Sequence, residues 1–276
     1  MSSFPDNPPP ATETPLTGDA PPATLPPLAA EAIHDPIWTG FDVFRLLVVG
    51  ALVLFLSVFA MLIVVPGTSF QQRAVRLSRS AELLIVAQMI AYVLLLAYMF
   101  ILVKKERRSP TFWKAIHWNW PGSIWPYLTI GVVLQIALLV MERFLPLPRE
   151  TPFDTLLRKP STVLLIAIFA VTLGPLMEEL FFRGFLYPVL ARRFGMMAGI
   201  SISALGFGLM HAAQYGYSWA SVMLIFLVGV TLGAVRAVKD SVAAGVLVHV
   251  AYNGTIVLIL AAATDGFRHL EKLSSQ

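Results

Sequence analysis

The chain has 276 residues, of which 57% are hydrophobic and only 13% are charged. Soluble globular domains carry about 25% charged residues, so this composition predicts a membrane protein. Because the chain has no cysteine, the sequence excludes a disulfide framework, a thiol nucleophile and a cysteine-ligated zinc or iron–sulfur site. A metal ion would need His and carboxylate ligands.

The first 40 residues are predicted to be a disordered acidic tail. Ten of the 20 prolines lie in the first 36 residues, among Ala, Thr and acids, a composition that cannot bury enough apolar surface to order the chain. The segment also lacks the basic start and early apolar stretch of a secretory signal peptide, so the first apolar run is expected to stay in the mature protein.

The charges that sum to the net value of +4 are unevenly distributed along the chain. Residues 1–44 hold six acids and no Lys or Arg, whereas residues 45–276 hold 20 basic and ten acidic side chains. These basic residues lie in short loops beside apolar runs, where they determine topology and contact phospholipid headgroups. We therefore expect a phospholipid bilayer as a partner, and no nucleic acid.

Seven apolar runs follow the tail, each near the roughly 20 residues that a bilayer-spanning helix needs. They cover residues 44–65, 81–103, 124–141, 161–177, 196–213, 218–238 and 242–263. Backbone polar groups in lipid must be satisfied internally, and no run shows the ten-residue alternation of a membrane barrel. The expected fold class is therefore all-α, a polytopic membrane bundle of about seven transmembrane helices.

The fourth run continues past the two glutamates Glu178 and Glu179 to Leu190. It predicts either one long helix or two pieces broken near Pro188, and the second case gives eight helices. Two pairs of glycines four residues apart predict close approach of helix backbones. They are Gly195 with Gly199, and Gly229 with Gly233.

Ionisable residues are concentrated in the last four apolar runs. Such a residue costs about 2.5 to 3.5 kcal/mol at the centre of a membrane helix, so its presence indicates function. The first three runs contain almost none. We therefore expect residues 41–160 to be a scaffold, residues 161–265 to be a catalytic core, and residues 266–276 to be a short polar tail.

The first polar motif contains Glu178, Glu179 and Arg183. On a helix, Glu179 and Arg183 lie on one face in the favourable order for an ion pair. Glu178 is rotated by about 100 degrees from Glu179, so it is free to point elsewhere. The competing interpretation is a buried charge cluster that only fixes helix packing.

Two further motifs follow on later runs. Phe207 and His211 are one turn apart, as are His249 and Asn253, so each pair projects from one side of its helix. A carboxylate in an apolar pocket is a competent general base, a nearby His can share its water, and a His with an amide donor can stabilise an oxyanion. The nucleophile elbow Gly-x-Ser-x-Gly and the zinc-protease pattern His-Glu-x-x-His are both missing from the sequence.

Together the three motifs resemble the signature of the CPBP family of intramembrane proteases, which includes the type II CAAX prenyl endopeptidases and bacterial proteins linked to bacteriocin processing and immunity. The resemblance covers roughly residues 160–260, and every motif position matches. It implies that Glu178 activates water together with His211, that His249 and Asn253 bind the oxyanion, and that supporting residues hold the site together. These supporting residues are Glu179, Arg183 and Phe207.

The resemblance leaves the metal question open. Glu178, His211 and His249 could ligate zinc with an open position for water, but the same residues could hydrolyse a peptide bond without metal. We favour the metal-free alternative, because Asn253 beside His249 is more typical of a donor pair than of a ligand shell.

The leading hypothesis is therefore an intramembrane endopeptidase that uses Glu- and His-activated water on a membrane-embedded or lipid-anchored protein or peptide. One alternative is a transporter that uses the same groups as a proton relay. The other is a catalytically silent scaffold or immunity protein. Short loops and the lack of a targeting tail favour the bacterial inner membrane as its location.

Overall fold

The computed structural model describes residues 36–270, so the predicted tail and the last six residues lie outside the described part. The described residues are helical and contain no strand. The elements are α2 (Gly40–Val64), α3 (Phe70–Ser78), α4 (Ala81–Ile101), η1 (Leu102–Glu106), α5 (Phe112–Ala115), α6 (Trp125–Glu142), η2 (Asp154–Arg158), α7 (Pro160–Val171), α8 (Leu173–Glu179), η3 (Leu180–Leu186), α9 (Tyr187–Phe194), α10 (Met196–Met210), η4 (Ala212–Tyr215), α11 (Trp219–Lys239) and α12 (Val242–Ala263).

The polytopic helical bundle expected from the apolar runs is confirmed. Among the described residues, six helices are long and apolar enough to cross a membrane by length and composition. They cover Gly40–Val64, Ala81–Glu106, Trp125–Glu142, Pro160–Phe194, Trp219–Lys239 and Val242–Ala263. The fifth apolar run, residues 196–213, forms α10, which has only 15 residues and is too short to span a bilayer of ordinary thickness unless the bilayer thins.

The fourth span follows the first of the two alternatives, one long helix, and has no break near Pro188. It is a continuous 35-residue segment, and its irregularity lies at Thr172, not near Pro188. Thr172 has φ −128° and ψ −95°, which separates α7 from α8. Pro188 instead occupies the first turn of α9, where a missing N–H is tolerated. Between α8 and α9 the chain passes through the π-helix η3, an element often found at functional sites.

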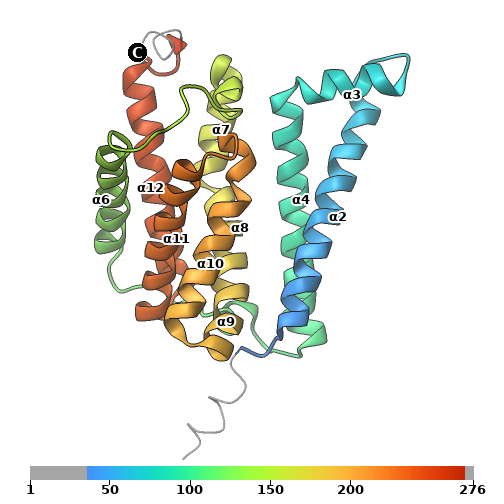
Figure 1. Cartoon of the computed structure of the whole chain (residues 1–276). Helices are drawn as coiled ribbons and strands as arrows, with labels where there is room; N and C mark the ends of the chain where they lie inside the picture. Colours follow the sequence, from blue (N-terminus) through green and yellow to red (C-terminus); the bar gives the residue numbers. More distant parts are fainter. Residues whose placement is uncertain (1–35, 271–276) are drawn as a thin grey trace, which may run out of the picture. The chain divides into compact units, whose positions relative to one another are not determined.

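The helices form two adjoining groups (Figure 1). α2 and α4 pack against each other and are joined by α3, while α12 packs against α6 and α11, and α10 packs against α9 and α11. α7 and α8 contact α4 on one side and α12 on the other. The fourth span therefore lies between the two groups, with its glutamates in the middle of the bundle.

Close helix contacts at glycine confirm part of the small-residue prediction. A Cβ atom at Gly229 would lie 2.9 Å from Ala204 Cα, and one at Gly233 would lie 3.1 Å from Ile200 Cγ2, so these glycines let α11 approach α10. Gly199 is equally close to Ala191 of α9. Gly195 has a different role: its φ of +86° ends α9 and begins α10.

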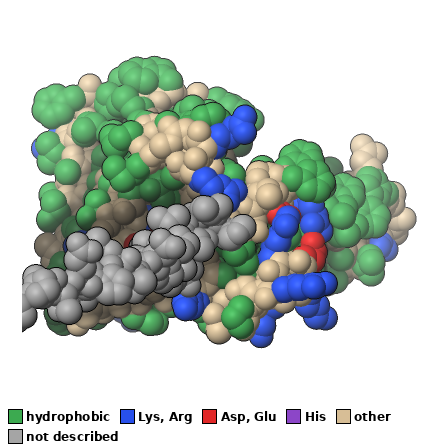
Figure 2. All heavy atoms as spheres, turned by 90° about the horizontal axis from the view of Figure 1, so that it is seen from below, with side chains coloured by type: hydrophobic (Ala, Val, Ile, Leu, Met, Phe, Trp, Pro, Cys, Tyr) green, Lys and Arg blue, Asp and Glu red, His purple; other side chains and the backbone are tan. Residues whose placement is uncertain are grey.

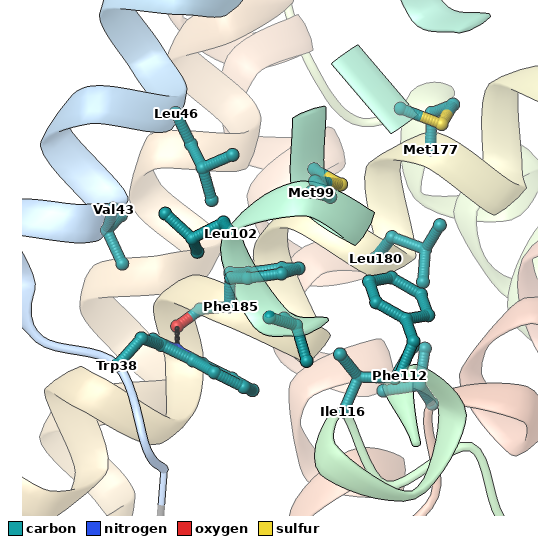
Figure 3. Close-up of a cluster of buried hydrophobic side chains, with 12 residues drawn as sticks. Trp38, Val43, Leu46, Met99, Leu102, Phe112, Ile116, Met177, Leu180 and Phe185 are labelled. Carbon is teal, nitrogen blue, oxygen red and sulfur yellow. Dashed lines mark hydrogen bonds between the residues drawn. The ribbon is translucent and has the colours of Figure 1, made fainter. Parts of the chain in front are cut away.

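The segment before α2 is tied to the fourth span. Trp38 is 1% exposed, its ring centroid lies 4.6 Å from that of Phe185 in η3, and its indole N–H donates to the Phe185 carbonyl at 3.0 Å (Figure 3). Arg192 of α9 donates to the carbonyls of Pro36 (2.8 Å) and Trp38 (3.2 Å). Residues 36–39, which the sequence places with the tail, therefore contact the bundle.

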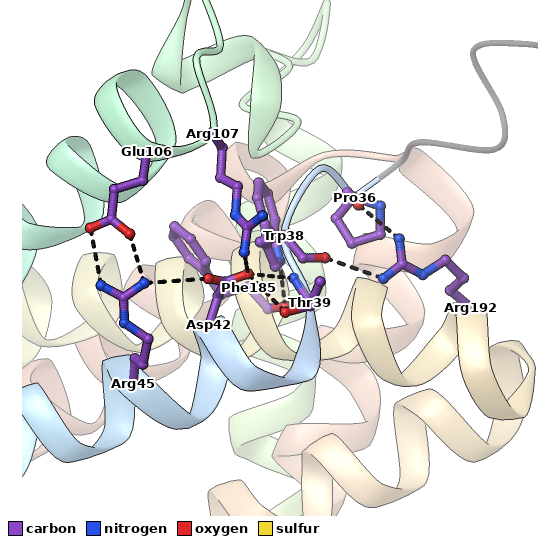
Figure 4. Close-up of polar contacts among 9 residues, drawn as sticks. All are labelled: Pro36, Trp38, Thr39, Asp42, Arg45, Glu106, Arg107, Phe185 and Arg192. Atoms are coloured by element: carbon purple, nitrogen blue, oxygen red, sulfur yellow. Dashed lines mark hydrogen bonds and ion pairs between the residues drawn. The ribbon is translucent and has the colours of Figure 1, made fainter.

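The same region joins α2 to the end of α4 (Figure 4). The buried carboxylate of Asp42 accepts from the Thr39 backbone at 2.7 Å, which forms a capping box, and it also accepts a hydrogen bond from Arg107. Arg45 forms a bidentate ion pair with Glu106, in which Nη1 donates to Oε2 at 2.6 Å and Nη2 donates to Oε1 at 3.1 Å. We call residues 36–45 with these partners the N-terminal clasp, because it connects α2, η1 and the fourth span.

Basic side chains gather on the end of the bundle that carries the clasp (Figure 2). Exposed lysines and arginines in this region include Lys104, Lys105 and Arg108 at the end of the second span. Trp120 and Trp125 are also exposed nearby along the chain, 65% and 71% respectively. Cationic and aromatic side chains next to apolar helices are typical of the membrane–water interface.

Candidate active site

The ion pair expected between Glu179 and Arg183 is present and fully buried. Arg183 Nη1 donates to Glu179 Oε1 at 2.9 Å, and both side chains are 0% exposed. Arg183 also donates to the carbonyl of Gly229 at 2.8 Å and lies over the ring of Phe207. The pair therefore connects the fourth span to α10 and α11.

His249 lies between the two glutamates. Its Nδ1 is 3.1 Å from Glu179 Oε1, and its Nε2 is 3.7 Å from Glu178 Oε2. Glu179 pairs with Arg183 as a carboxylate, and a carboxylate can only accept, so His249 Nδ1 carries the hydrogen of this bond. Glu179 thus fixes the orientation of His249 and directs Nε2 toward Glu178.

Phe207 lies at the centre of the polar group. Its ring centroid is 4.8 Å from that of His211 and 5.8 Å from that of His249, and its side chain is 2% exposed. The Phe207 carbonyl accepts from His211 Nδ1 at 2.8 Å, at the point where α10 ends. Because this bond places the hydrogen on Nδ1, the Nε2 atom of a neutral His211 is left as an acceptor.

Asn253 contacts the irregular part of the fourth span. Its Nδ2 donates to the carbonyl of Ala170 at 2.7 Å. Carbonyls in the last turn of a helix lack intrahelical partners, so Asn253 compensates for the break at Thr172. The second hydrogen on Asn253 Nδ2 remains available for another acceptor.

Two cavities meet at these residues. The α2–α4 cavity has a volume of about 360 Å³, and the α7–α12 cavity has a volume of about 320 Å³. Glu178, His211 and Gln214 line both cavities. His249, Asn253 and Phe207 line the α7–α12 cavity. The structure thus brings Glu178, both histidines and Asn253 to one cavity, whereas Glu179 and Arg183 are buried behind it.

Three polar residues that line these cavities are not among the site residues that the sequence predicts. Gln214 lines both cavities, and Gln88 and Tyr92 of α4 line the α2–α4 cavity. Gln88 lies within an apolar run and Gln214 lies just after one. Because an amide is not ionisable, neither residue belongs to the ionisable set that indicates the site. The expected division into a scaffold half and a site half is therefore incomplete, because α4 contributes polar groups to the site.

The sequence left open a zinc site formed by Glu178, His211 and His249. Within residues 36–270, no three His, Asp or Glu side chains are grouped so that they could hold a metal ion. The proposed reaction therefore involves no metal ion.

The structure thus gathers two glutamates and two histidines beside cavities inside a helical bundle. Residues 160–255 match the family described as type II CAAX prenyl endopeptidase Rce1-like. This match agrees with the resemblance seen in the motifs of the same segment. The apolar helices make the chain an integral membrane protein, and residues 160–255 are similar to intramembrane endopeptidases. No curated protein and no solved structure matches the chain.

Proposed function

We propose that the protein hydrolyses a peptide bond in a membrane-embedded or lipid-anchored substrate by means of a water molecule activated by Glu178 and His211. The observation that carries this proposal is that Glu178 and His211 border both cavities. A substrate that extends through the two cavities passes both side chains, so its scissile carbonyl comes within reach of a water held there.

In the proposed reaction, Glu178 removes a proton from the water while the water oxygen attacks the carbonyl carbon of the substrate. His211 Nε2 accepts the second hydrogen of this water and so orients it. As the carbon–nitrogen bond breaks, Glu178 returns the proton to the leaving amine. The products are a new carboxylate and a new amino terminus.

The developing oxyanion is stabilised by His249 and Asn253. His249 Nδ1 donates to Glu179, and in the imidazolium form its Nε2 is a second donor for the oxyanion. Asn253 contributes the amide hydrogen that does not contact Ala170. Donors that are held in place before the reaction need little reorganisation in the transition state.

The proposed chemistry requires no metal, since base, water-orienting acceptor and oxyanion donors are all side chains of this chain. The family description names CAAX prenyl endopeptidases, so a lipid-modified carboxyl-terminal peptide is a suitable first probe. We further propose that the protein resides in a bacterial inner membrane, where its natural substrates need not be prenylated.

The test compares purified protein with Glu178→Gln after incubation with a membrane proteome, followed by mapping of new peptide termini. Glu150→Gln serves as the matched control, because Glu150 is an exposed glutamate in the loop before α7. We expect new termini with the native protein and the control but none with Glu178→Gln. Identical termini in all three samples would rule out this site as the source of hydrolysis.

A further inference from the structure

The wall of the α2–α4 cavity that faces Glu178 is almost entirely apolar. α2 and α4 contribute nine lining residues, of which Gln88 and Tyr92 are polar. The others are Leu, Ala or Gly side chains. Gln88 and Tyr92 hydrogen bond to each other, which uses one hydrogen-bonding atom of each side chain. Both side chains keep further hydrogen-bonding capacity for a group in the cavity.

Gln88 and Tyr92 lie four residues apart, on one face of α4. The ring of Tyr92 stacks on Phe169 of α7, with a centroid distance of 5.6 Å, so packing fixes its direction. Both side chains are half-buried and line the same cavity as Glu178, His211 and Gln214. The two helix groups therefore present polar atoms to one space from opposite sides.

The chemistry of these two side chains matches that of a peptide backbone. A carboxamide offers donors and an acceptor, and a phenol hydroxyl offers one of each. An extended peptide inside the membrane has unpaired N–H and C=O groups that lipid cannot satisfy. Side chains with both kinds of group can pair with that backbone without selecting for the substrate side chains.

We propose that Gln88 and Tyr92 bind the substrate main chain in the α2–α4 cavity, beside the peptide bond that Glu178 addresses. This inference rests on the proposed peptidase function and assigns α4 a direct part in substrate binding. Because the contacts exist before and during the reaction, their loss weakens binding without changing the chemical step.

The test uses Gln88→Met and Tyr92→Phe, which keep side-chain size and remove the hydrogen-bonding atoms. Tyr98→Phe is the control, because Tyr98 lies on the same helix but faces Arg45. The probe is a fluorescent peptide in detergent micelles that ends in an S-farnesylcysteine and three further residues. We expect KM to rise about three- to tenfold for each of the two variants, the usual cost of one hydrogen bond, with kcat unchanged and Tyr98→Phe unaffected.

A binding measurement separates this inference from the proposed function. Each substitution is repeated in the Glu178→Gln background, and the dissociation constant of the same probe is measured, along with that of a probe with one backbone amide changed to an ester. We expect the ester to weaken binding to the parent protein and to weaken it less once Gln88 or Tyr92 is replaced. Weaker binding by these variants without any cleavage by native protein would refute the peptidase and retain the binding role. Equal binding by all variants, or no binding at all, would overturn the inference.

Discussion

Glu179 and His249 form a buried hydrogen bond of 3.1 Å that joins the fourth span to the last helix. The carboxylate that accepts this bond also receives Arg183 at 2.9 Å. Glu179 therefore has two tasks, because it neutralises a buried arginine and sets the ring orientation of a histidine in the site. The motif spacing predicts the first task, but the second depends on how α12 packs against α8.

The two neighbouring glutamates are expected to respond differently to the same substitution. Glu178→Gln removes the proposed base and nearly preserves shape, so activity should vanish while the melting temperature stays near that of native protein. Glu179→Gln leaves Arg183 buried without a charged partner, a loss of about 3 to 5 kcal/mol, and also releases His249. Thermal unfolding and peptide cleavage assays check both effects. Similar melting temperatures for the two variants would contradict this division of roles.

Gly245 is expected to tolerate no side chain. A Cβ atom there would lie 2.7 Å from Glu179 Oε2, so Gly245→Ala should displace the carboxylate and lower both activity and melting temperature. Gly254 lies on the same helix with nothing within 4 Å of its Cβ position, which makes Gly254→Ala the matched control. Equal effects of the two substitutions would show that helix propensity, not the contact with Glu179, determines the outcome.

The contacts of the N-terminal clasp predict that removal of residues 1–35 and removal of residues 1–38 affect the stability of the protein differently. Removal of residues 1–35 should preserve activity, because their proline-rich acidic composition offers too little apolar surface to pack against the bundle. Removal of residues 1–38, or the point change Trp38→Ala, should lower stability by about 3 to 5 kcal/mol, since a buried aromatic ring and its hydrogen bond to Phe185 are lost. Unfolding in detergent at increasing temperature checks this order. A 1–38 truncation as stable as the 1–35 truncation would refute a structural role for the clasp.

Removal of metal ions should leave activity unchanged. We expect extensively chelated protein to cleave at the native rate, since Glu178, His211 and His249 are not arranged as a ligand set. Asn253→Ala should lower kcat by about a hundredfold, the usual loss of one oxyanion donor. Zinc content and turnover measured on the same samples check this prediction. Loss of activity on chelation that stoichiometric zinc restores would make the histidines metal ligands.

Acid should weaken the turn between α11 and α12. The hydrogen bond with His117, at 2.7 Å, holds the pKa of Asp240 at about 2, below the ordinary 3.8. A carboxyl group with a lowered pKa in the folded state stabilises the protein above about pH 4, and this contribution is lost as the pH falls toward 2. The melting temperature should therefore fall more steeply over this range for native protein than for Asp240→Asn.

Asp265→Asn is the control for this measurement, because Asp265 is an exposed acid that follows α12. Its acid profile should match that of native protein. The difference at Asp240 should also shrink in high salt, because that side chain is 60% exposed and its pairs are screened. Parallel acid profiles for native protein and Asp240→Asn would contradict the prediction.

The sequence by itself determined the membrane class, the helical bundle and the identity of the polar motifs. Hydropathy reports span length directly, since lipid forces every backbone group into a helix. Spacing within one helix determined the Glu179–Arg183 pair, because residues four apart are neighbours whatever the tertiary structure. The family resemblance rests on the same local patterns and was confirmed over residues 160–255.

Only the tertiary structure decided which helices face each other across the site. The contact of His249 with Glu179 and the use of Asn253 at the helix break join positions far apart in the chain. So does the placement of Gln88 and Tyr92 opposite Glu178. Such contacts depend on the rotation and register of packed helices, which apolar runs leave undetermined because nearly every face of these helices is apolar. The break at Thr172, by contrast, is readable from the sequence, because Pro175 has no N–H for the carbonyl of Val171 and its ring crowds that carbonyl.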